Sequence, residues 1–336
     1  MKKLNIFKLP FLSSFVVIAI LIFGNLTTIS QSRAQVYGVN EDSLIAIDRF
    51  LSMKNSGELR SRFVAREDEM RKLADALCVI LERNTGELAE RIPFDFRIDD
   101  ATFWGHDSIY TGENIEIRLK GDGSLSGVFL LTAHYDAIAH RTTDWKSNWT
   151  SMPAPGANDN ATGVATLLEL SRVLKSGTLP FDIIFVLFAA EELGLIGSED
   201  FVARYDSLFG DRILGVLNVD MIGYSPSGNE GCTIYSNHYS GWLAELVETY
   251  ARENFNLNNF NLWVFKPAIA NSDHAPFWEK GVSAITFVEP VDEYGFFYYP
   301  YYHTINDTLG NVNFSQVRKI ACIIEGFLNS LSLIHI

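Results

Sequence analysis

Three nearly continuous apolar runs in the middle of the sequence constrain the fold most strongly. They cover residues 127–133 (GVFLLTA), 181–190 (FDIIFVLFAA) and 213–219 (ILGVLNV). A strand with one face in water alternates apolar and polar residues, whereas a strand that is buried on both faces is apolar throughout. Runs of this length, rich in Val, Ile, Leu and Phe, therefore predict strands in the interior of a sheet that is covered on both sides.

Segments with helical periodicity alternate with these runs. Between Glu67 and Arg83 the apolar residues recur on one helical face. Further helices are expected over residues 163–175, 198–205, 241–254, 274–280 and 314–331, and further strands over residues 115–119, 232–236 and 282–289. This alternation predicts an α/β fold with a mostly parallel or mixed sheet between two layers of helices.

Residues 1–34 have the organisation of a signal peptide. Three lysines precede an apolar run over residues 15–24, and small residues flank Arg33 at the position where a signal peptidase cleaves. The apolar run has ten residues, fewer than the roughly 20 that a membrane span needs. We therefore expect cleavage after Ala34 and export to the periplasm or the medium, without stable association with the membrane afterwards.

The rest of the chain has the size of one catalytic domain. No repeat or low-complexity linker interrupts it, so we expect a lead-in over residues 35–59 and one domain over residues 60–333. Asp and Glu total 41 against 27 Lys and Arg, which gives a formal net charge of -14. Because nucleic-acid binders carry a basic surface, this acidic excess excludes that class of partner. The carboxylates either keep the surface soluble or gather around cations.

Polar residues follow the apolar runs at the points where the strands should end. The first run continues into residues 134–136 (HYD), the second into residues 191–192 (EE) and the third into Asp220. A fourth segment, PGANDN, places Asp159 just before a predicted helix. Functional sites of open α/β sheets lie at the carboxyl ends of the strands, so these side chains are expected to meet.

Each of these residues also has a purely structural interpretation. Asp159 stands where a helix N-cap favours Asp, and Glu191 and Glu192 suit the first turn of a helix. His134 and Asp136 can form a solvated loop pair. However, residues i and i+2 of an extended chain share one side, so Asp136 can hold one imidazole nitrogen of His134 while the other faces a metal.

A later histidine, His303, closes an aromatic-rich stretch over residues 292–304. With the strand-end residues it completes a set of nitrogen and oxygen donors that contains no thiolate: His134, Asp159, Glu192, Asp220 and His303. Such a set suits a pair of divalent ions, with zinc the expected metal and one carboxylate bridging. A two-metal centre polarises a carbonyl and activates water, and the remaining carboxylate of Glu191 is placed to accept the water proton.

These residues stand in six motifs that together resemble the M28 metallopeptidases, a family of zinc peptidases that includes secreted aminopeptidases. In family order the motifs are HYD (134–136), GANDNATG (156–163), AAEELGLIGS (189–198), NVDMIG (218–223), SDHAPF (272–277) and YYHTINDTL (301–309). The resemblance spans about residues 105–330. It implies the zinc-exopeptidase fold, a three-layer α/β sandwich around a central, mostly parallel or mixed sheet.

The resemblance also implies the metal ligands. Asp159 matches the carboxylate that bridges two zinc ions in the family. Glu192 and His303 match the remaining protein ligands of one ion, and His134 and Asp220 match those of the other.

Further roles are implied around these ligands. Glu191 matches the general base, and Asp136 matches the partner of the first histidine ligand. Tyr302 matches a residue that in some members donates a hydrogen bond to the scissile carbonyl, although this position varies in the family. The resemblance also implies a cis peptide bond between Asp159 and Asn160, and a supporting role near the metals for residues 272–277.

The expected protein is an exported aminopeptidase with two zinc ions that hydrolyses N-terminal residues from peptides. The aromatic residues between 296 and 302 either line a pocket for apolar side chains or cover the core. Sequons occur at Asn148, Asn160, Asn306 and Asn313. A glycan on Asn160 would crowd the site, which favours export from a bacterium, where sequons are not used. The sequence leaves the oligomeric state open.

Three alternatives remain open. A glutaminyl cyclase shares the fold and the ligands but uses one zinc ion and transfers an acyl group. A carboxypeptidase or dipeptidase of the family needs a cation for the substrate carboxylate, for which Arg141 and Lys146 are candidates. A binding ectodomain without catalysis usually lacks ligands, whereas all five are present here.

Overall fold

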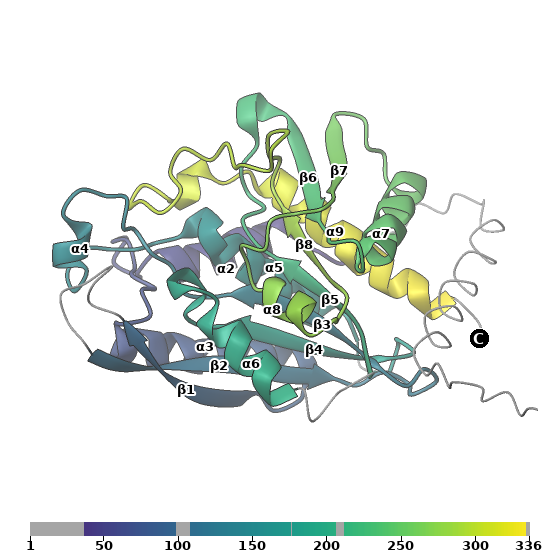
Figure 1. Ribbon diagram of the computed structural model, residues 1–336, viewed down its shortest axis with the longest axis horizontal. Coiled ribbons are helices and arrows are strands. Elements are labelled where there is room, and N and C mark those ends of the chain that lie inside the picture. The colour runs from purple at the N-terminus through teal and green to yellow at the C-terminus, as the bar shows by residue number, and fades with distance from the viewer. Residues whose placement is uncertain (1–36, 99–107, 176, 206–211, 334–336) are drawn as a thin grey trace, which may run out of the picture.

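The computed structural model describes residues 37–98, 108–175, 177–205 and 212–333 (Figure 1). The expected signal peptide over residues 1–34 lies outside these ranges. Within them, no helix combines the length and the apolar composition that crossing a membrane requires.

A mixed sheet of eight strands forms the centre of the described chain, in the order β1-β2-β4-β3-β5-β8-β6-β7. Its strands are β1 (Glu90–Ile98), β2 (Ser108–Leu119), β3 (Val128–His134), β4 (Asp182–Phe188), β5 (Ile213–Val219), β6 (Glu230–Tyr235), β7 (Phe260–Phe265) and β8 (Ala284–Val288). Strands β4, β3, β5 and β8 run parallel to one another, β2 joins β4 in antiparallel orientation, and β6 joins β8 in the same way. The expected α/β fold with a mixed central sheet is confirmed.

Helices cover both faces of this sheet. They are α2 (Glu41–Ser52), α3 (Glu67–Thr85), α4 (Trp145–Asn148), α5 (Thr162–Val173), α6 (Ile196–Tyr205), α7 (Gly241–Asn254), α8 (Ala275–Glu279) and α9 (Phe314–Ser330). Short helical turns η2 (Ala157–Ala161), η3 (Glu191–Leu193), η5 (Pro226–Gly228), η6 (Leu309–Asn311) and η7 (Leu331–Leu333) stand between them. Figure 1 shows α6 and α8 in front of the sheet and α2, α3 and α5 behind it.

The interior strands are apolar throughout because each of them supplies two cores. Along β3, Phe129 and Leu131 belong to the larger core, which includes the inner faces of α2, α3, α5 and α9. Their neighbours Val128 and Leu130 belong to the smaller core, together with Phe201 of α6. Burying a side chain of this kind stabilises the fold by roughly 1.5–3 kcal/mol, which favours apolar residues along β3. The polar exceptions stand near its carboxyl end: Thr132, whose hydroxyl donates to the side chain of Asn218 at 2.7 Å, and His134.

The sequence analysis did not predict the two edge strands, β1 and β7. The side chains of β1 alternate between exposed and buried towards its end, and the strand contains Pro93. In β7 the alternation covers only the first positions. Edge strands tolerate proline and face water on one side, so they lack the continuous apolar run that marks interior strands.

The lead-in before residue 60 packs against the main core. Leu44 and Leu51 of α2 are fully buried in the larger core. The Asn40 N–H and the Ser43 hydroxyl both donate to the carboxylate of Glu169 in α5, at 2.7 and 2.8 Å. The expected domain boundary at residue 60 stays a prediction, but α2 shares its core with the rest of the chain.

Candidate functional site

The strands that carry the predicted site residues are neighbours in the sheet. Strands β4, β3 and β5 lie side by side and parallel, so their carboxyl ends meet at one edge. His134 is the last residue of β3, Glu191 and Glu192 open η3 after β4, and Asp220 follows β5 directly. The strand register therefore delivers these side chains to one place.

Asp159 reaches this edge from the η2 turn. The carboxylate of Asp307 accepts hydrogen bonds from the N–H groups of Asn158 and Asp159, at 2.8 and 3.0 Å. Tyr299 donates its hydroxyl to the same carboxylate at 2.6 Å. The peptide bond between Asp159 and Asn160 is cis, as the family resemblance implies. The turn is thus held from outside by Asp307, a residue almost 150 positions later in the chain.

The five predicted ligand side chains lie close together. Nε2 of His134 is 3.3 Å from Oδ1 of Asp159 and 3.3 Å from Oδ1 of Asp220. Nε2 of His303 is 3.1 Å from Oδ2 of Asp159 and 2.8 Å from Oε2 of Glu192. Asp159 therefore presents one oxygen to each of two donor sets.

His303 is held by the loop that follows β3. The backbone N–H of Arg141 donates to the His303 carbonyl at 3.0 Å. One position on, the Thr142 hydroxyl accepts the Ile305 N–H at 2.9 Å. The ring of His140 lies 4.8 Å from the ring of His303, centre to centre. The segment that supplies His303 is therefore fixed to the loop that follows His134.

Several residues at the site have backbone angles that side chains other than glycine rarely adopt. The φ angle is +58° at Ala190, +50° at Met221 and +59° at His303. Such positions cost on the order of 1–3 kcal/mol each and persist only where surrounding contacts enforce them. Ala190 precedes Glu191, Met221 follows Asp220, and His303 is itself a proposed ligand. Contacts in the fold therefore hold the backbone at these three positions in a conformation that the residues alone would not favour.

Asp136 anchors the turn that contains Glu191 and Glu192. Its two carboxylate oxygens accept the N–H groups of Glu191 and Glu192, at 3.2 and 3.3 Å. Oδ1 of Asp136 lies 3.6 Å from Nδ1 of His134, which is longer than a hydrogen bond. In this structure Asp136 therefore positions the acidic turn, and its expected role as the partner of His134 stays a prediction.

The electrostatics of the site are those of a crowded acidic centre. Burial raises the pKa of Glu192 to about 7, and nearby Asp159 adds to this increase. Burial also raises the pKa of Glu191 well above the ordinary carboxyl value. Burial lowers the pKa of the His303 imidazole, but Glu192 and Asp159 outweigh it and raise that pKa to about 10. The folded site thus favours added positive charge.

The donors fit a pair of divalent cations. Two overlapping groups have donor atoms within 4.8 Å of one another: His134 with Asp159 and Glu192, and His134 with Glu191 and Asp220. Among the described residues, Nδ1 of His134 and Nδ1 of His303 have no hydrogen-bond partner. Imidazole nitrogen with carboxylate oxygen is the donor chemistry that zinc accepts. The second group includes Glu191, which the resemblance treats as a base rather than a ligand.

The sequence analysis missed part of the supporting network. Glu289 accepts the Asn158 side-chain amide at 2.7 Å and the Tyr224 N–H at 2.9 Å. It follows β8 in the same way that Asp220 follows β5, so the strand-end signal was present in the sequence. Asp307 stands inside the YYHTINDTL motif, where only the histidine and its preceding tyrosine received roles.

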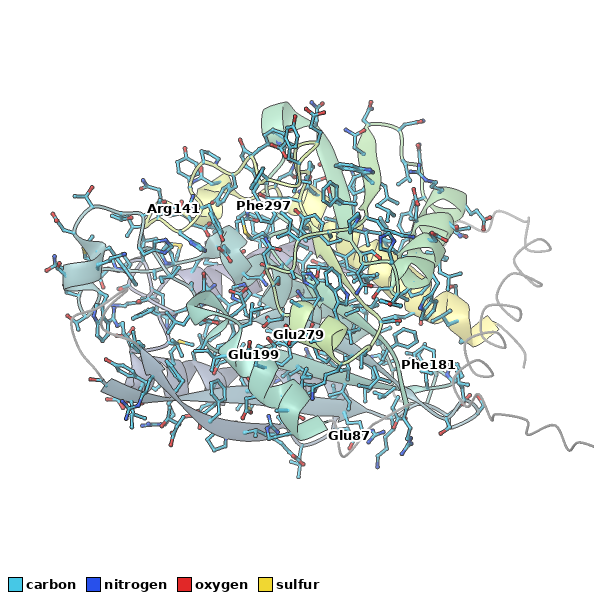
Figure 2. All side chains as sticks on the ribbon, in the orientation of Figure 1. Glu87, Arg141, Phe181, Glu199, Glu279 and Phe297 are labelled. Atoms are coloured by element: carbon cyan, nitrogen blue, oxygen red, sulfur yellow. The ribbon has the colours of Figure 1, made fainter. Side chains whose placement is uncertain are left out.

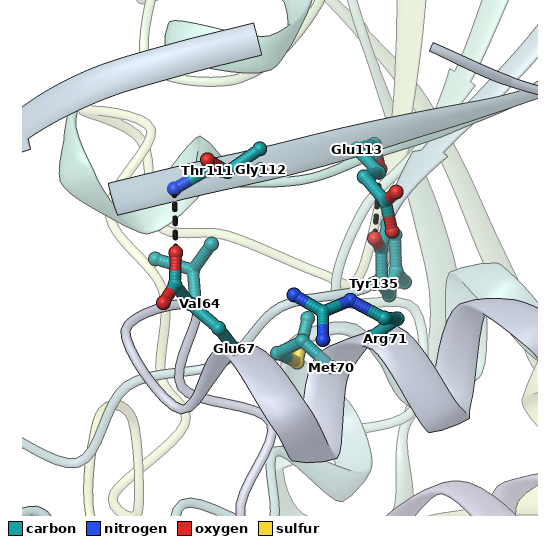
Figure 3. Close-up of a pocket in the computed structure, with 8 residues that line it drawn as sticks. All are labelled: Val64, Glu67, Met70, Arg71, Thr111, Gly112, Glu113 and Tyr135. Atoms are coloured by element: carbon teal, nitrogen blue, oxygen red, sulfur yellow. Dashed lines mark hydrogen bonds between the residues drawn. The ribbon is translucent and has the colours of Figure 1, made fainter. Parts of the chain in front are cut away.

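A small pocket lies away from these donors, between α3 and β2 (Figure 3). It is lined by Val64, Glu67, Met70, Arg71, Thr111, Gly112, Glu113 and Tyr135. Tyr135 follows His134 but lies on the other side of the extended chain, and its hydroxyl donates to the Glu113 carbonyl at 2.7 Å. The pocket is therefore lined by Tyr135 and its neighbours and by none of the five proposed ligands.

Comparison with known proteins gives relatives that match more than half of this chain. Aminopeptidase YwaD of Bacillus subtilis is 30% identical over 196 residues, which are 57% of this chain and 38% of that protein. A protein of Leptosphaeria maculans named "Probable zinc metalloprotease" is 25% identical over 304 residues, 81% of this chain and 61% of that one. This chain thus spans less than two thirds of the length of either relative.

Solved structures share the fold. BSAP, a zinc aminopeptidase from Bacillus subtilis, superposes with a TM-score of 0.69 at 17% identity, over 88% of this chain and 96% of that one. The glutaminyl cyclase of Porphyromonas gingivalis superposes with a TM-score of 0.67 at 20% identity, over 87% and 98%. The fold is therefore common to both activities. The sequence model of peptidase family M28 matches residues 114–328, and this chain belongs to that family.

Proposed function

We propose that this chain is an aminopeptidase that uses two zinc ions to remove the first residue of a peptide. The observation that carries the proposal is the position of Asp159, with one oxygen 3.3 Å from His134 and the other 3.1 Å from His303. A carboxylate placed in this way suits a bridge between two ions. The names of the relatives, an aminopeptidase and a zinc metalloprotease, agree with this function.

In this proposal each histidine serves one ion. His134 and Asp220 would hold the first, His303 and Glu192 would hold the second, and Asp159 would contribute to both. The zinc ions, when bound, polarise the scissile carbonyl and lower the pKa of water at the site. The protein supplies the remaining steps.

Glu191 is the proposed proton carrier. It accepts a proton from the attacking water as the carbon–oxygen bond forms, and passes it to the leaving amine as the carbon–nitrogen bond breaks. Its side chain is 10% exposed, and its Oε2 lies 3.9 Å from Nε2 of His134. The hydrogen bond from the Glu191 N–H to the Asp136 carboxylate fixes the turn that carries Glu191. Because burial raises its pKa, Glu191 is suited to hold a proton between the two steps.

Tyr302 is the proposed donor to the carbonyl oxygen. Its ring stacks on His303 with 3.6 Å between ring centres and an angle of 28°. Burial raises the pKa of its hydroxyl, and the nearby carboxylates of Asp159 and Glu192 raise it further. The phenol therefore keeps its proton and can donate it in a hydrogen bond as negative charge develops on the oxygen.

We also propose that the first residue of the substrate is apolar and that the protein acts after export. Phe297 lies 6.1 Å from Tyr302, ring centre to ring centre, so aromatic surface adjoins the His303 side of the site. In the same stretch, Tyr299 is buried, whereas Phe296 and Tyr298 are 63% and 49% exposed. These residues therefore divide between core and surface. Export rests on the sequence of residues 1–34.

The Glu191→Gln variant tests the function directly. It should lower turnover of leucine p-nitroanilide by about 10²–10⁴-fold, the contribution of a general acid–base group, while zinc content stays near two ions per chain. Glu199→Gln, which changes an exposed acid in the first turn of α6, is the matched control and should keep full activity. Full turnover by Glu191→Gln would refute the assignment.

The same preparation separates the aminopeptidase from a cyclase. A glutaminyl cyclase would convert an N-terminal glutamine to pyroglutamate and leave leucine p-nitroanilide intact. The donor set of His134 and Asp220 also predicts that Asp220→Ala lowers the zinc content towards one ion. Pyroglutamate formation, with one zinc ion in the unmodified protein, would favour the cyclase instead.

A further inference from the structure

Arg141 is an exposed cation beside the acidic centre. Its guanidinium carbon lies 4.6 Å from the centre of the Tyr302 ring. Among the described residues it forms no ion pair with a carboxylate. Figure 2 labels Arg141 and Phe297 on the same side of the molecule, and both lie against Tyr302. A cation without an acidic partner is unusual next to so many acids, which calls for another explanation.

The backbone around Arg141 is fixed relative to the site. Its N–H donates to the carbonyl of His303 at 3.0 Å, and Thr142 accepts the Ile305 N–H at 2.9 Å. The preceding residue, His140, lies against the His303 ring. The Arg141 side chain therefore starts from a defined point beside a proposed ligand.

The distances define which part of a substrate it can reach. Tyr302 stacks on His303, and Arg141 lies over the same tyrosine, so the guanidinium is within about 10 Å of the His303 ring, about the length of three extended residues. A peptide whose amino end lies at the acidic centre would thus bring its second or third residue to Arg141.

The contact with Tyr302 does not by itself account for the residue. An exposed cation over an aromatic ring contributes only about 0.5–1 kcal/mol, so the guanidinium of Arg141 remains available to a stronger partner. Its planar donors match a carboxylate in two parallel hydrogen bonds. The acids of the centre repel a substrate carboxylate, whereas Arg141 offers such a group an exposed cation beside Tyr302.

We propose that Arg141 binds a carboxylate of the peptide substrate and so directs the enzyme to short peptides or to peptides with an acidic second or third residue. The inference rests on the proposed aminopeptidase function and adds a specificity to it. The carboxylate comes either from the free carboxyl end of a dipeptide or tripeptide, or from an acidic side chain. Both sources present the same chemistry to the guanidinium.

Matched substrates test this preference. The tripeptide Leu-Ala-Ala is compared with its carboxyl-terminal amide, and Leu-Glu-Ala amide with Leu-Gln-Ala amide. The unmodified enzyme should show a kcat/KM at least tenfold higher for the acid of at least one pair, mainly through a lower KM. The pair that responds identifies the source of the carboxylate. The preference should weaken as salt rises, because the pair is exposed.

Variants connect the preference to the residue. Arg141→Met should bring the ratio of kcat/KM within each pair close to one, and Arg141→Lys should keep part of it through charge alone. Arg83→Met, which removes an exposed arginine from the end of α3, is the control and should keep the ratio of the unmodified enzyme. Equal rates on both members of both pairs, or a preference that survives in Arg141→Met, would overturn the proposal.

Binding measurements separate this proposal from the proposed function. Calorimetry with both pairs, the acid and amide of Leu-Ala-Ala and the Leu-Glu-Ala and Leu-Gln-Ala amides, should give the same preference in the pair that responds, and the same loss in Arg141→Met, whether or not the peptide is cleaved. Binding that shows the preference without hydrolysis would support carboxylate recognition and refute the aminopeptidase assignment. Binding without the preference would refute carboxylate recognition, whatever the rate of hydrolysis.

Discussion

Replacing Arg62 by methionine tests how the two loops of the site are held together. Arg62 is fully buried, and its Nε donates to the carbonyl of Tyr135 at 2.9 Å. Its two terminal nitrogens donate to the carbonyls of Pro155 and Gly156. Tyr135 lies in the loop after β3, and the other two residues precede η2. One side chain thus links the segments that carry His134 and Asp159.

The structure gives the size of the expected effect. A hydrogen bond from a charged donor contributes roughly 1.5–3 kcal/mol, and Arg62 makes three of them. Removing one member of a buried charged network costs about 3–5 kcal/mol, because the remaining groups stay buried without compensation. Asp48 and Asp307 are those groups here, since both favour the charged form of Arg62. We expect Arg62→Met to lower the free energy of unfolding by about 3–5 kcal/mol.

Urea unfolding of the metal-loaded protein, followed by fluorescence, measures this change. Arg60→Met is the matched control, because Arg60 is only partly buried, donates to Met53 at 3.5 Å and lies 5.4 Å from the centre of the Phe50 ring. Its loss should cost less than about 1 kcal/mol. A loss below 1 kcal/mol in Arg62→Met as well would refute the reasoning. Arg62 precedes the region that the family model matches, so the result also tests whether this earlier segment supports the site.

Three further predictions concern stability. Tyr299→Phe removes the 2.6 Å hydrogen bond to Asp307 and should lower the free energy of unfolding in urea by roughly 1.5–3 kcal/mol at pH 8. Burial raises the pKa of Asp307 to about 6, so its carboxylate is ionised at that pH. An unchanged midpoint would contradict this prediction. Burial raises the pKa of Glu169, but Arg172, Asn40 and Ser43 outweigh it and hold the pKa below the ordinary glutamate value of 4.5. Its contribution is therefore present above that pH and lost below it, and Glu169→Gln should flatten the fall in stability below about pH 4.5, whereas equal slopes would argue against the role. Chelation should lower the melting temperature and zinc should restore it, because zinc at a free concentration of 100 times Kd raises the free energy of unfolding by about 2.7 kcal/mol; equal melting curves would count against a metal centre.

Burial on both faces explains which strands the sequence could predict. β3, β4 and β5 pack against helices on both sides, so their sequences contain almost no polar residues. β1 and β7 each lack a neighbour on one side; the exposed positions of β1 include charged residues, and those of β7 are Asn261 and Trp263. A short alternating segment with a proline resembles a loop as much as a strand. The information that makes these segments strands lies in the neighbours with which they pair.

The same distinction applies to the site. His134, Glu192 and Asp220 stand at the ends of interior strands, and the rule that such ends meet was enough to bring them together. The network that orients Asp159 has no local signal of this kind. Asn158 and Glu289 are separated by 131 positions and pair only because η2 and the end of β8 meet in the fold. A single sequence shows which residues end a strand but not which distant backbone groups they satisfy.

The buried carboxylates at the carboxyl ends of β3, β4 and β5 make the stability of this edge of the sheet depend on what neutralises their charge. Asp136 is satisfied by backbone N–H groups, Asp159 relies on imidazole nitrogens, and Glu192 has one imidazole nitrogen and the Ile138 N–H as partners. Two imidazoles cannot neutralise all the acids, so without cations the folded site takes up protons, as the raised pKa of Glu191 and of Glu192 indicates. A protonated carboxyl is a poor metal ligand, and a bound cation removes the need for the proton. Proton uptake and metal binding therefore compete for the same groups, and the stability of this edge should depend on both.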